Sequence, residues 1–114
     1  MPYELRFRPE ALADLEDIVR AIRRASGSIE LARRYAARVL ERCQHIATLP
    51  HAGRPRDDLA PGVRTVPFEQ RLVIVYRAGV PDLVEITNIF HGRRDYAALY
   101  PRPAETVLPA AGST

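Results

Sequence analysis

Residues 88–96 carry the densest group of chemically active side chains in the sequence. They read Asn-Ile-Phe-His-Gly-Arg-Arg-Asp-Tyr, so an apolar run ends at Gly92 and two guanidinium groups, a carboxylate and a phenol follow. The β-branched and aromatic residues before the glycine are typical of a buried strand. Polar groups at a strand end suit a binding or catalytic rim. They suit equally a solvated turn in which Asp95 pairs with a neighbouring arginine.

Arginine supplies all of the basic charge. The chain has 17 basic and 14 acidic residues and a net charge of +3, and it contains no lysine. The planar guanidinium binds carboxylates and phosphates well, which suits protein interfaces and nucleic-acid backbones, although a GC-rich gene would produce the same bias. The excess of positive charge is mild and no aromatic stacking platform is evident. These features disfavour a module whose only role is to bind nucleic acid.

Cysteine, histidine and hydropathy exclude several classes of protein. One cysteine and three scattered histidines offer neither a disulfide framework nor a metal-ligand spacing, so we expect no metal and no cofactor. No apolar run is long enough to span a bilayer, and the first residues alternate instead of forming a signal peptide. We therefore expect a cytoplasmic protein that has no membrane contact.

The first half of the chain predicts a strand followed by a helical hairpin. Residues 3–7 alternate apolar and polar, and Pro9 is well placed to open a helix. Gly27 can end that helix in a left-handed conformation, and Ser28 can cap a second helix that runs to about Leu49. The second helix carries an apolar stripe on one side, formed by Ala32, Tyr35, Ala36, Val39, Cys43, Ile46 and Leu49.

The second half predicts a meander of three strands after a loop rich in proline and glycine at residues 50–62. The strand-like runs cover residues 63–67, 71–77 and 83–90, and the middle run is apolar on both faces. Together these elements predict an α+β fold of order β-α-α-β-β-β, in which a two-helix hairpin packs on one face of a mainly antiparallel four-stranded sheet. The other face would stay exposed. Residues 1–100 would form the domain, and residues 101–114 a flexible tail rich in proline and alanine.

With these elements in order, the chain resembles the RelE/ParE superfamily of toxins from bacterial type II toxin–antitoxin systems, and the ParE branch in particular. The resemblance covers about residues 3–100. Five motifs carry it: Ala-Asp-Leu-Glu-Asp-Ile at 13–18, Leu-Pro-His-Ala-Gly-Arg at 49–54, Gly-Val-Arg at 62–64, Val73-Ile74 with Tyr76-Arg77, and Ile-Phe-His-Gly-Arg-Arg-Asp at 89–95.

The resemblance implies a toxin that arrests bacterial growth, as in plasmid stabilisation. It also implies a ParD-like antitoxin with a ribbon-helix-helix DNA-binding domain. The toxin would then contact DNA only indirectly, through this antitoxin. ParE-like members bind and block DNA gyrase without a reaction of their own. RelE-like members are ribosome-dependent endoribonucleases that cut messenger RNA without a metal ion.

The two chemistries need different residues. For gyrase binding, the candidates are exposed arginines and an aromatic residue: Arg93, Arg94, Tyr96, Arg54 and Arg56. For RNA cleavage, the positions in register with the nuclease branch are Arg64, Arg71, Arg94 and Tyr100, and His91 is a further candidate as a base or an acid. Ion pairs of Arg71 with Glu69 or Glu85, and of Arg64 with Asp57 or Asp58, would give those two arginines structural roles instead. The nuclease branch usually adds lysines to this sheet, so we favour the stoichiometric gyrase inhibitor.

Overall fold

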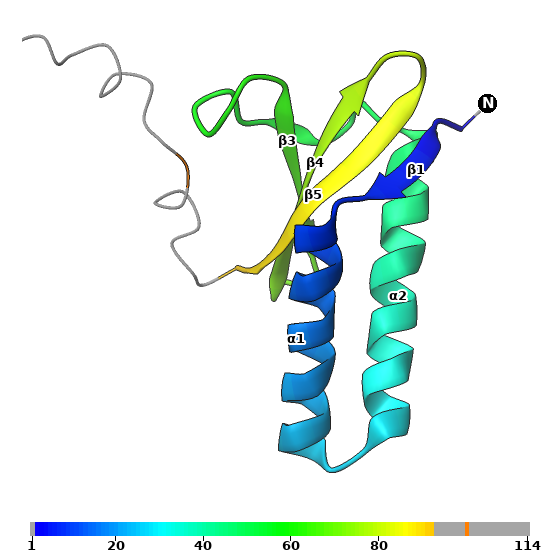
Figure 1. The fold of residues 1–114 in the computed structure, drawn as a ribbon, viewed down its shortest axis with the longest axis vertical. Helices are drawn as coiled ribbons and strands as arrows, with labels where there is room; N and C mark the ends of the chain where they lie inside the picture. Colours follow the sequence, from blue (N-terminus) through cyan, green and yellow to red (C-terminus); the bar gives the residue numbers. More distant parts are fainter. Residues whose placement is uncertain (1, 93–99, 101–114) are drawn as a thin grey trace, which may run out of the picture.

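The computed structural model describes residues 2–92 and Tyr100. Two helices and five strands follow one another along the chain (Figure 1). They are β1 (Glu4–Phe7), α1 (Pro9–Ser26), α2 (Ile29–Thr48), β2 (Arg54–Pro55), β3 (Val63–Phe68), β4 (Leu72–Gly79) and β5 (Leu83–His91). Neither of the two helices described is long and apolar enough to cross a membrane.

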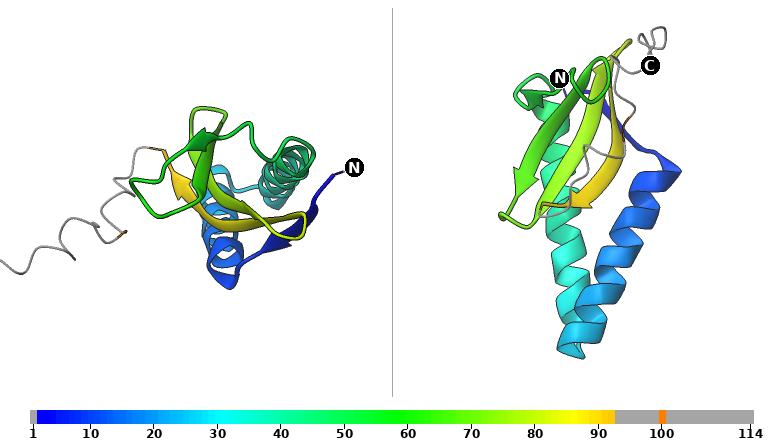
Figure 2. Two further views of the ribbon diagram at one scale, coloured as in Figure 1. Left: turned by 90° about the horizontal axis from the view of Figure 1, so that it is seen from above. Right: turned by 90° about the vertical axis from the view of Figure 1, so that its left-hand side faces the viewer.

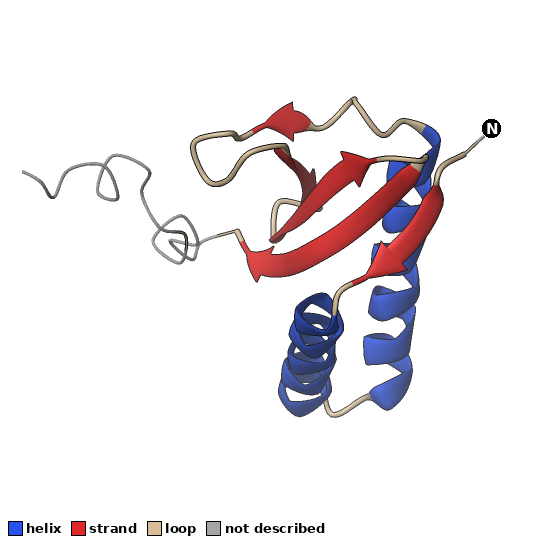
Figure 3. Ribbon diagram, turned by 45° about the horizontal axis from the view of Figure 1, so that its top comes forward, coloured by secondary structure: helices blue, strands red, loops and turns tan. Residues whose placement is uncertain are grey.

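The strands form one sheet in the order β1-β5-β4-β3-β2, in which β1 runs parallel to β5 and the other neighbours are antiparallel. The helical hairpin covers one face of this sheet, and its tip extends beyond the strands (Figure 2). The predicted α+β class and the order β-α-α-β-β-β are confirmed. The predicted number of four strands is wrong, because β2 adds a fifth strand at the edge (Figure 3). A two-residue strand that includes Pro55 has no alternation from which it could be recognised.

The hairpin turn follows the predicted caps. Pro9 is the first residue of α1, and Gly27 ends the helix with a φ of 72° while its N–H bonds to the Arg23 carbonyl. Only glycine adopts this left-handed conformation without strain. The Ser28 hydroxyl then accepts a hydrogen bond of 3.1 Å from the Leu31 amide at the start of α2. The start and end of α1 and the start of α2 therefore lie where the local sequence favours them.

The main core lies between the hairpin and the sheet. Ala11 of α1, Val39 and Cys43 of α2, and Ile74 and Tyr76 of β4 are all fully buried there. The predicted stripe of α2 is confirmed up to Ile46. Leu49 was wrongly predicted to belong to it: α2 ends at Thr48, and the Leu49 side chain is 54% exposed.

The far face of the sheet is partly covered, contrary to the exposed face that was predicted. A second buried cluster joins Leu59 to Val63, Val75 and Phe90, with Tyr100 packed against it. The covering segment is the loop at 56–62, which folds back over the sheet. This loop supplies the apolar cover that a central strand with apolar side chains on both faces requires.

Asp14 completes the free edge of β5. The strand β1 ends at Phe7, opposite Ile86, so it leaves the later amides of β5 without a strand partner. The Asp14 carboxylate accepts hydrogen bonds there from the Ile89 amide at 2.9 Å and from the Asn88 side-chain amide at 3.3 Å. An unpaired amide would cost about 1–3 kcal/mol. Asp14 thus fixes α1 to β5 at the start of the stretch 88–96.

The turn between β3 and β4 is strained, which leads to a stability prediction. Glu69 and Gln70 have φ values of 49° and 59°, a conformation that glycine and asparagine favour in two-residue hairpins. Gln70→Gly should relieve the strain and raise the free energy of unfolding by about 1 kcal/mol. Urea denaturation measures this change. As a matched control, Gln44→Gly on the exposed side of α2 should lower the free energy by about 1 kcal/mol; a similar loss for Gln70→Gly would contradict the prediction.

Candidate functional site

The strand β5 places the start of the stretch 88–96 at the end of the sheet where β4 begins. His91 is the last residue of β5, lies opposite Leu72 and is exposed. The Gly92 amide donates a hydrogen bond of 2.6 Å to the Arg71 carbonyl, and a Cβ on Gly92 would lie 3.3 Å from the same oxygen. Glycine therefore serves a close backbone approach here. The predicted site residues Arg93, Arg94 and Tyr96, together with Asp95, lie outside the described residues.

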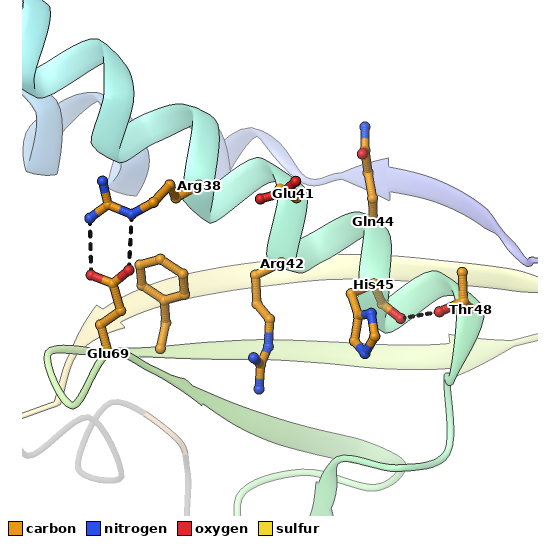
Figure 4. A pocket seen from close by; sticks show the side chains of 8 residues that line it. Arg38, Glu41, Arg42, Gln44, His45, Thr48 and Glu69 are labelled. Carbon is orange, nitrogen blue, oxygen red and sulfur yellow. Dashed lines mark hydrogen bonds and ion pairs between the residues drawn. The ribbon is translucent and has the colours of Figure 1, made fainter.

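Arg71 lies beside a charged cluster that ties the strained turn to α2. The Glu69 carboxylate, a predicted partner of Arg71, instead receives two hydrogen bonds from Arg38, at 2.9 and 3.0 Å (Figure 4). These hydrogen bonds lower the pKa of Glu69, and the nearby Arg71 charge lowers it further. The Arg38 guanidinium also lies 5.1 Å from the centre of the Tyr35 ring.

Arg64 has a structural partner in the loop at 50–53. Its Nη1 donates to the carbonyls of His51 and Gly53, both at 2.9 Å. The predicted partners are engaged elsewhere: Asp57 accepts from the Gly62 amide, and Asp58 pairs with Arg56. Arg64 therefore fastens the connection between α2 and β2 to the sheet.

Tyr76 lies directly opposite Arg64 and fastens the same loop. Its hydroxyl donates to the Pro50 carbonyl at 2.8 Å and accepts from the Gly53 amide at 3.1 Å. Burial raises the pKa of this phenol. Both Tyr76 and Gly53 belong to the motifs that carry the family resemblance, but no role was predicted for either. The signal available in the sequence was the small residue Gly53, which closely follows the helix-ending Pro50.

Tyr100 lies on the opposite side of the sheet from Arg64. It packs against the far-face cluster that contains Val63 and Val75, whereas Arg64 is paired with Tyr76, which faces the helices. Arg64 also lies four positions along β3 from Phe68, or about 13 Å from the turn that precedes Arg71. Among the described nuclease candidates, the structure brings Arg71 and His91 near one strand end and places Arg64 and Tyr100 apart from them and from each other.

The two candidate arginines of the loop differ in their availability. Arg56 donates to both carboxylate oxygens of Asp58, at 2.9 and 2.8 Å, and these hydrogen bonds lower the pKa of Asp58. Arg54 is exposed on β2. Because β3 and β4 separate β2 from β5, Arg54 lies about 14 Å from β5. A large partner could contact both places, whereas a small ligand could not.

Cys43 is an inert thiol by its position, which gives a second prediction. Desolvation raises its pKa to about 12, whereas an unfolded thiol titrates near pH 8.5. Between these values the unfolded state binds fewer protons, so the free energy of unfolding should fall as pH rises from about 8.5 toward 12. A thiol reagent at about pH 8 should label the protein only after denaturation. Rapid labelling of the folded protein would contradict this.

The metal chemistry of the described residues is equally limited. Within 2–92 and at Tyr100, no three histidine, cysteine, aspartate or glutamate side chains gather in a group that could hold a metal ion.

Comparison with known proteins places this arrangement in a family. The family described as the ParE toxin of the type II toxin–antitoxin system parDE matches residues 5–96. Because the match covers most of the chain, the protein belongs to the ParE toxin family. A search of curated proteins found no significant match.

Two solved structures share the fold. The first is the chromosomal ParDE system of P. aeruginosa, with 23% sequence identity, a TM-score of 0.68, and coverage of 78% of this chain and 95% of that chain. The second is the toxin–antitoxin complex RelBE2 of Mycobacterium tuberculosis, with 22% identity, a TM-score of 0.60, and coverage of 80% and 99%. At these identities the similarity establishes the fold alone.

Proposed function

We propose that this chain is the toxin of a type II toxin–antitoxin pair and arrests growth by binding DNA gyrase in the cytoplasm. Its membership of the ParE toxin family supports the toxin role. Both similar structures belong to systems that contain an antitoxin, which supports a cognate partner here. We further propose that this partner is ParD-like and binds DNA through a ribbon-helix-helix domain.

The separation of the nuclease candidates is the observation that favours gyrase binding. Cutting RNA without a metal ion needs a base, an acid and cations within reach of one phosphate. Arg64 is held by two backbone carbonyls on the helix-facing side of the sheet, and Tyr100 packs on the far side. The described candidates would therefore not meet at one phosphate. Binding a large protein requires no such convergence.

The proposed contact surface combines the end of β5 with the edge strand. Arg93, Arg94 and Tyr96 follow Gly92 in sequence, and Arg54 is exposed on β2. A standard protein interface covers about 800 Å² on each partner, which is wide enough to include both. Arginine and tyrosine are among the residues that contribute most to such interfaces. Arg56 contributes less in this proposal, because Asp58 already binds it.

Induction of the gene in a bacterial host tests the proposal. We expect supercoiling and replication to stop first, together with a DNA-damage response, and co-expression of the antitoxin should prevent both effects. Protein synthesis and message length should stay normal at the time when replication stops. Fragmented messages and halted translation before any loss of supercoiling would contradict gyrase as the target and favour RNA cleavage.

A further inference from the structure

A small polar cavity lies on the far face of the sheet, near the point where β1 leads into α1 beside β5 (Figure 1). It has a volume of about 180 Å³, and Val63 and Tyr100 form its wall on the side of the far-face cluster. The remaining lining residues are polar or charged: Arg8, Glu10, Arg77, Thr87 and Asn88. We call this hollow the far-face cavity. Its lining favours a polar ligand.

A β-bulge in β5 brings two consecutive side chains to the far-face cavity. Along β4, Val75 is paired with Asn88, whereas the next residue, Tyr76, is paired with Ile86. Thr87 is therefore an extra residue that has no partner in β4. In a regular strand, consecutive side chains point to opposite faces, so only one of Thr87 and Asn88 would line the cavity. Bulges that redirect side chains in this way are common next to functional sites.

Two contacts hold the bulge residues in position. The Thr87 hydroxyl donates a hydrogen bond of 3.2 Å to the Val75 carbonyl. The Asn88 side-chain amide donates one of 3.3 Å to the Asp14 carboxylate. A side-chain amide has two N–H groups, so the second one of Asn88 is available to a ligand. The polar wall is thus ordered before any ligand binds, which lowers the entropic cost of binding.

Arg77 adds a guanidinium with a buried donor. It is paired with Val63 in β3 and with Glu85 in β5. Its Nε is buried, and the residues that the structure describes offer this N–H no hydrogen-bond acceptor. Within the same residues, no ion pair joins Arg77 to Glu85. A buried N–H without an acceptor is unfavourable, so a bound group with acceptor oxygens would be stabilised here.

The cavity carries an excess of positive charge. Arg8 and Arg77 line it, against the single carboxylate of Glu10. The Glu10 Oε1 lies 3.5 Å from the Arg8 Nε, in an ion pair whose side chains are 60% and 44% exposed. An ion pair with this exposure is weak. Two guanidinium groups against one weakly held carboxylate favour an anionic ligand.

We propose that the far-face cavity binds a phosphate group through Arg8, Arg77 and Asn88. The two guanidinium groups come from separate elements, the N-cap of α1 and the strand β4. Phosphate oxygens point in several directions and can bind both, whereas the two oxygens of a carboxylate share one plane and suit a single guanidinium.

The size of the cavity limits the ligand. Its volume of about 180 Å³ is below the roughly 300 Å³ at which pockets for drug-sized ligands begin. The phosphate is therefore either free or the terminal group of a larger molecule whose remainder stays outside. Arg8, Arg77 and Asn88 belong to neither set of candidates for gyrase binding or RNA cleavage. The inference thus goes beyond the proposed function and does not depend on it.

Titration with inorganic phosphate, followed by the NMR signals of the arginine Nε–H groups, tests this site in the purified full-length chain. Sodium chloride keeps the ionic strength constant. The Arg77 signal, identified by its loss in Arg77→Met, should shift and saturate, while that of the exposed Arg20 stays in place. Acetate should bind at least about tenfold more weakly than phosphate. Equal, unsaturated shifts of all arginine signals would show an adventitious ion only, and equal binding of acetate would also overturn the proposal.

Thermal melting of variants gives a second readout. A ligand that binds only the folded chain raises its Tm, so phosphate should raise the Tm of the unchanged chain. Arg77→Met should lose this rise, and Arg8→Ala, a substitution at a partly exposed side chain, should weaken phosphate binding by about tenfold. Arg20→Met removes an exposed arginine of α1 that pairs with Asp17, and it should keep the rise. An undiminished rise in both the Arg77 and Arg8 variants would overturn the proposal.

Two thymidine dinucleotides distinguish the sources of the phosphate. One carries a 5′-terminal phosphate and the other ends in a hydroxyl. If the phosphorylated dinucleotide shifts the Arg77 signal at a lower concentration than inorganic phosphate does, the site takes a nucleotide end; if it needs a higher concentration, the site takes free phosphate. Either result supports a phosphate site. A shift of the same size caused by both dinucleotides would contradict recognition of a terminal phosphate.

Discussion

Replacing Tyr76 with alanine is expected to lower the free energy of unfolding by about 3–5 kcal/mol, the largest loss expected for a single substitution in this fold. The ring is fully buried at the centre of β4, between the sheet and both helices. Its hydroxyl also joins the Pro50 carbonyl and the Gly53 amide. The substitution therefore leaves a cavity and two unpaired backbone groups.

Chemical denaturation of three further variants separates these contributions. Tyr76→Phe keeps the ring and should cost about 1–3 kcal/mol through the unpaired groups. Gly53→Ala should also destabilise, because a Cβ there would collide with the Tyr76 hydroxyl and ring. The same loop is held by Arg64, so Arg64→Ala should loosen it without emptying the core. If Tyr76→Ala lowered the free energy of unfolding by less than about 1 kcal/mol, the burial and hydrogen bonds of Tyr76 would not stabilise the fold as proposed.

Replacing Arg93 and Arg94 together with alanine is expected to abolish growth arrest. Arginines at the centre of an interface often contribute about 2 kcal/mol each, so the pair would weaken target binding by about a thousandfold. Surviving colonies after induction measure the effect, and pull-down with the antitoxin tests whether the fold and the partner contact persist.

The matched control for this pair is Arg23→Ala with Arg24→Ala. These adjacent arginines are exposed in the last turn of α1, at the tip of the hairpin. Their loss should leave growth arrest intact, which excludes a general effect of lowering the positive charge. Unchanged toxicity of the Arg93 and Arg94 variant would remove the leading site from the proposal.

The sequence predicted those features of the fold that local physics determines. Proline at a helix start, Gly27 with a left-handed φ and Ser28 as a cap each depend on a few neighbouring residues, and all three are confirmed. The apolar run of β4 likewise identified the central strand. These signals are local, so they can be recognised in the sequence without knowledge of the tertiary structure.

Contacts between distant segments could not be read in the same way. The strand β2 exists because Arg54 and Pro55 meet β3, and the loop at 56–62 covers the far face because β4 needs burial there. The Asp14 carboxylate likewise bonds an amide 75 positions away in sequence. Periodicity along the chain contains none of this information.

The candidate site was predictable in composition but not in arrangement. Charge and aromatic content marked residues 88–96, and the family resemblance supplied the nuclease positions. The partners of Arg64 proved to be backbone carbonyls, which have no side-chain signature. Leu49 completed the apolar stripe of α2 on the sequence, yet the helix ends one residue earlier and leaves the Leu49 side chain exposed.

The most direct test of gyrase binding uses purified components. Relaxed plasmid, purified DNA gyrase and ATP are incubated with the full-length chain, and a parallel reaction contains translating ribosomes with a labelled message. We predict that the chain inhibits supercoiling in proportion to its concentration, that the antitoxin restores supercoiling, and that the message stays intact. Normal supercoiling at a concentration of the chain that cleaves the message on the ribosome would contradict the account.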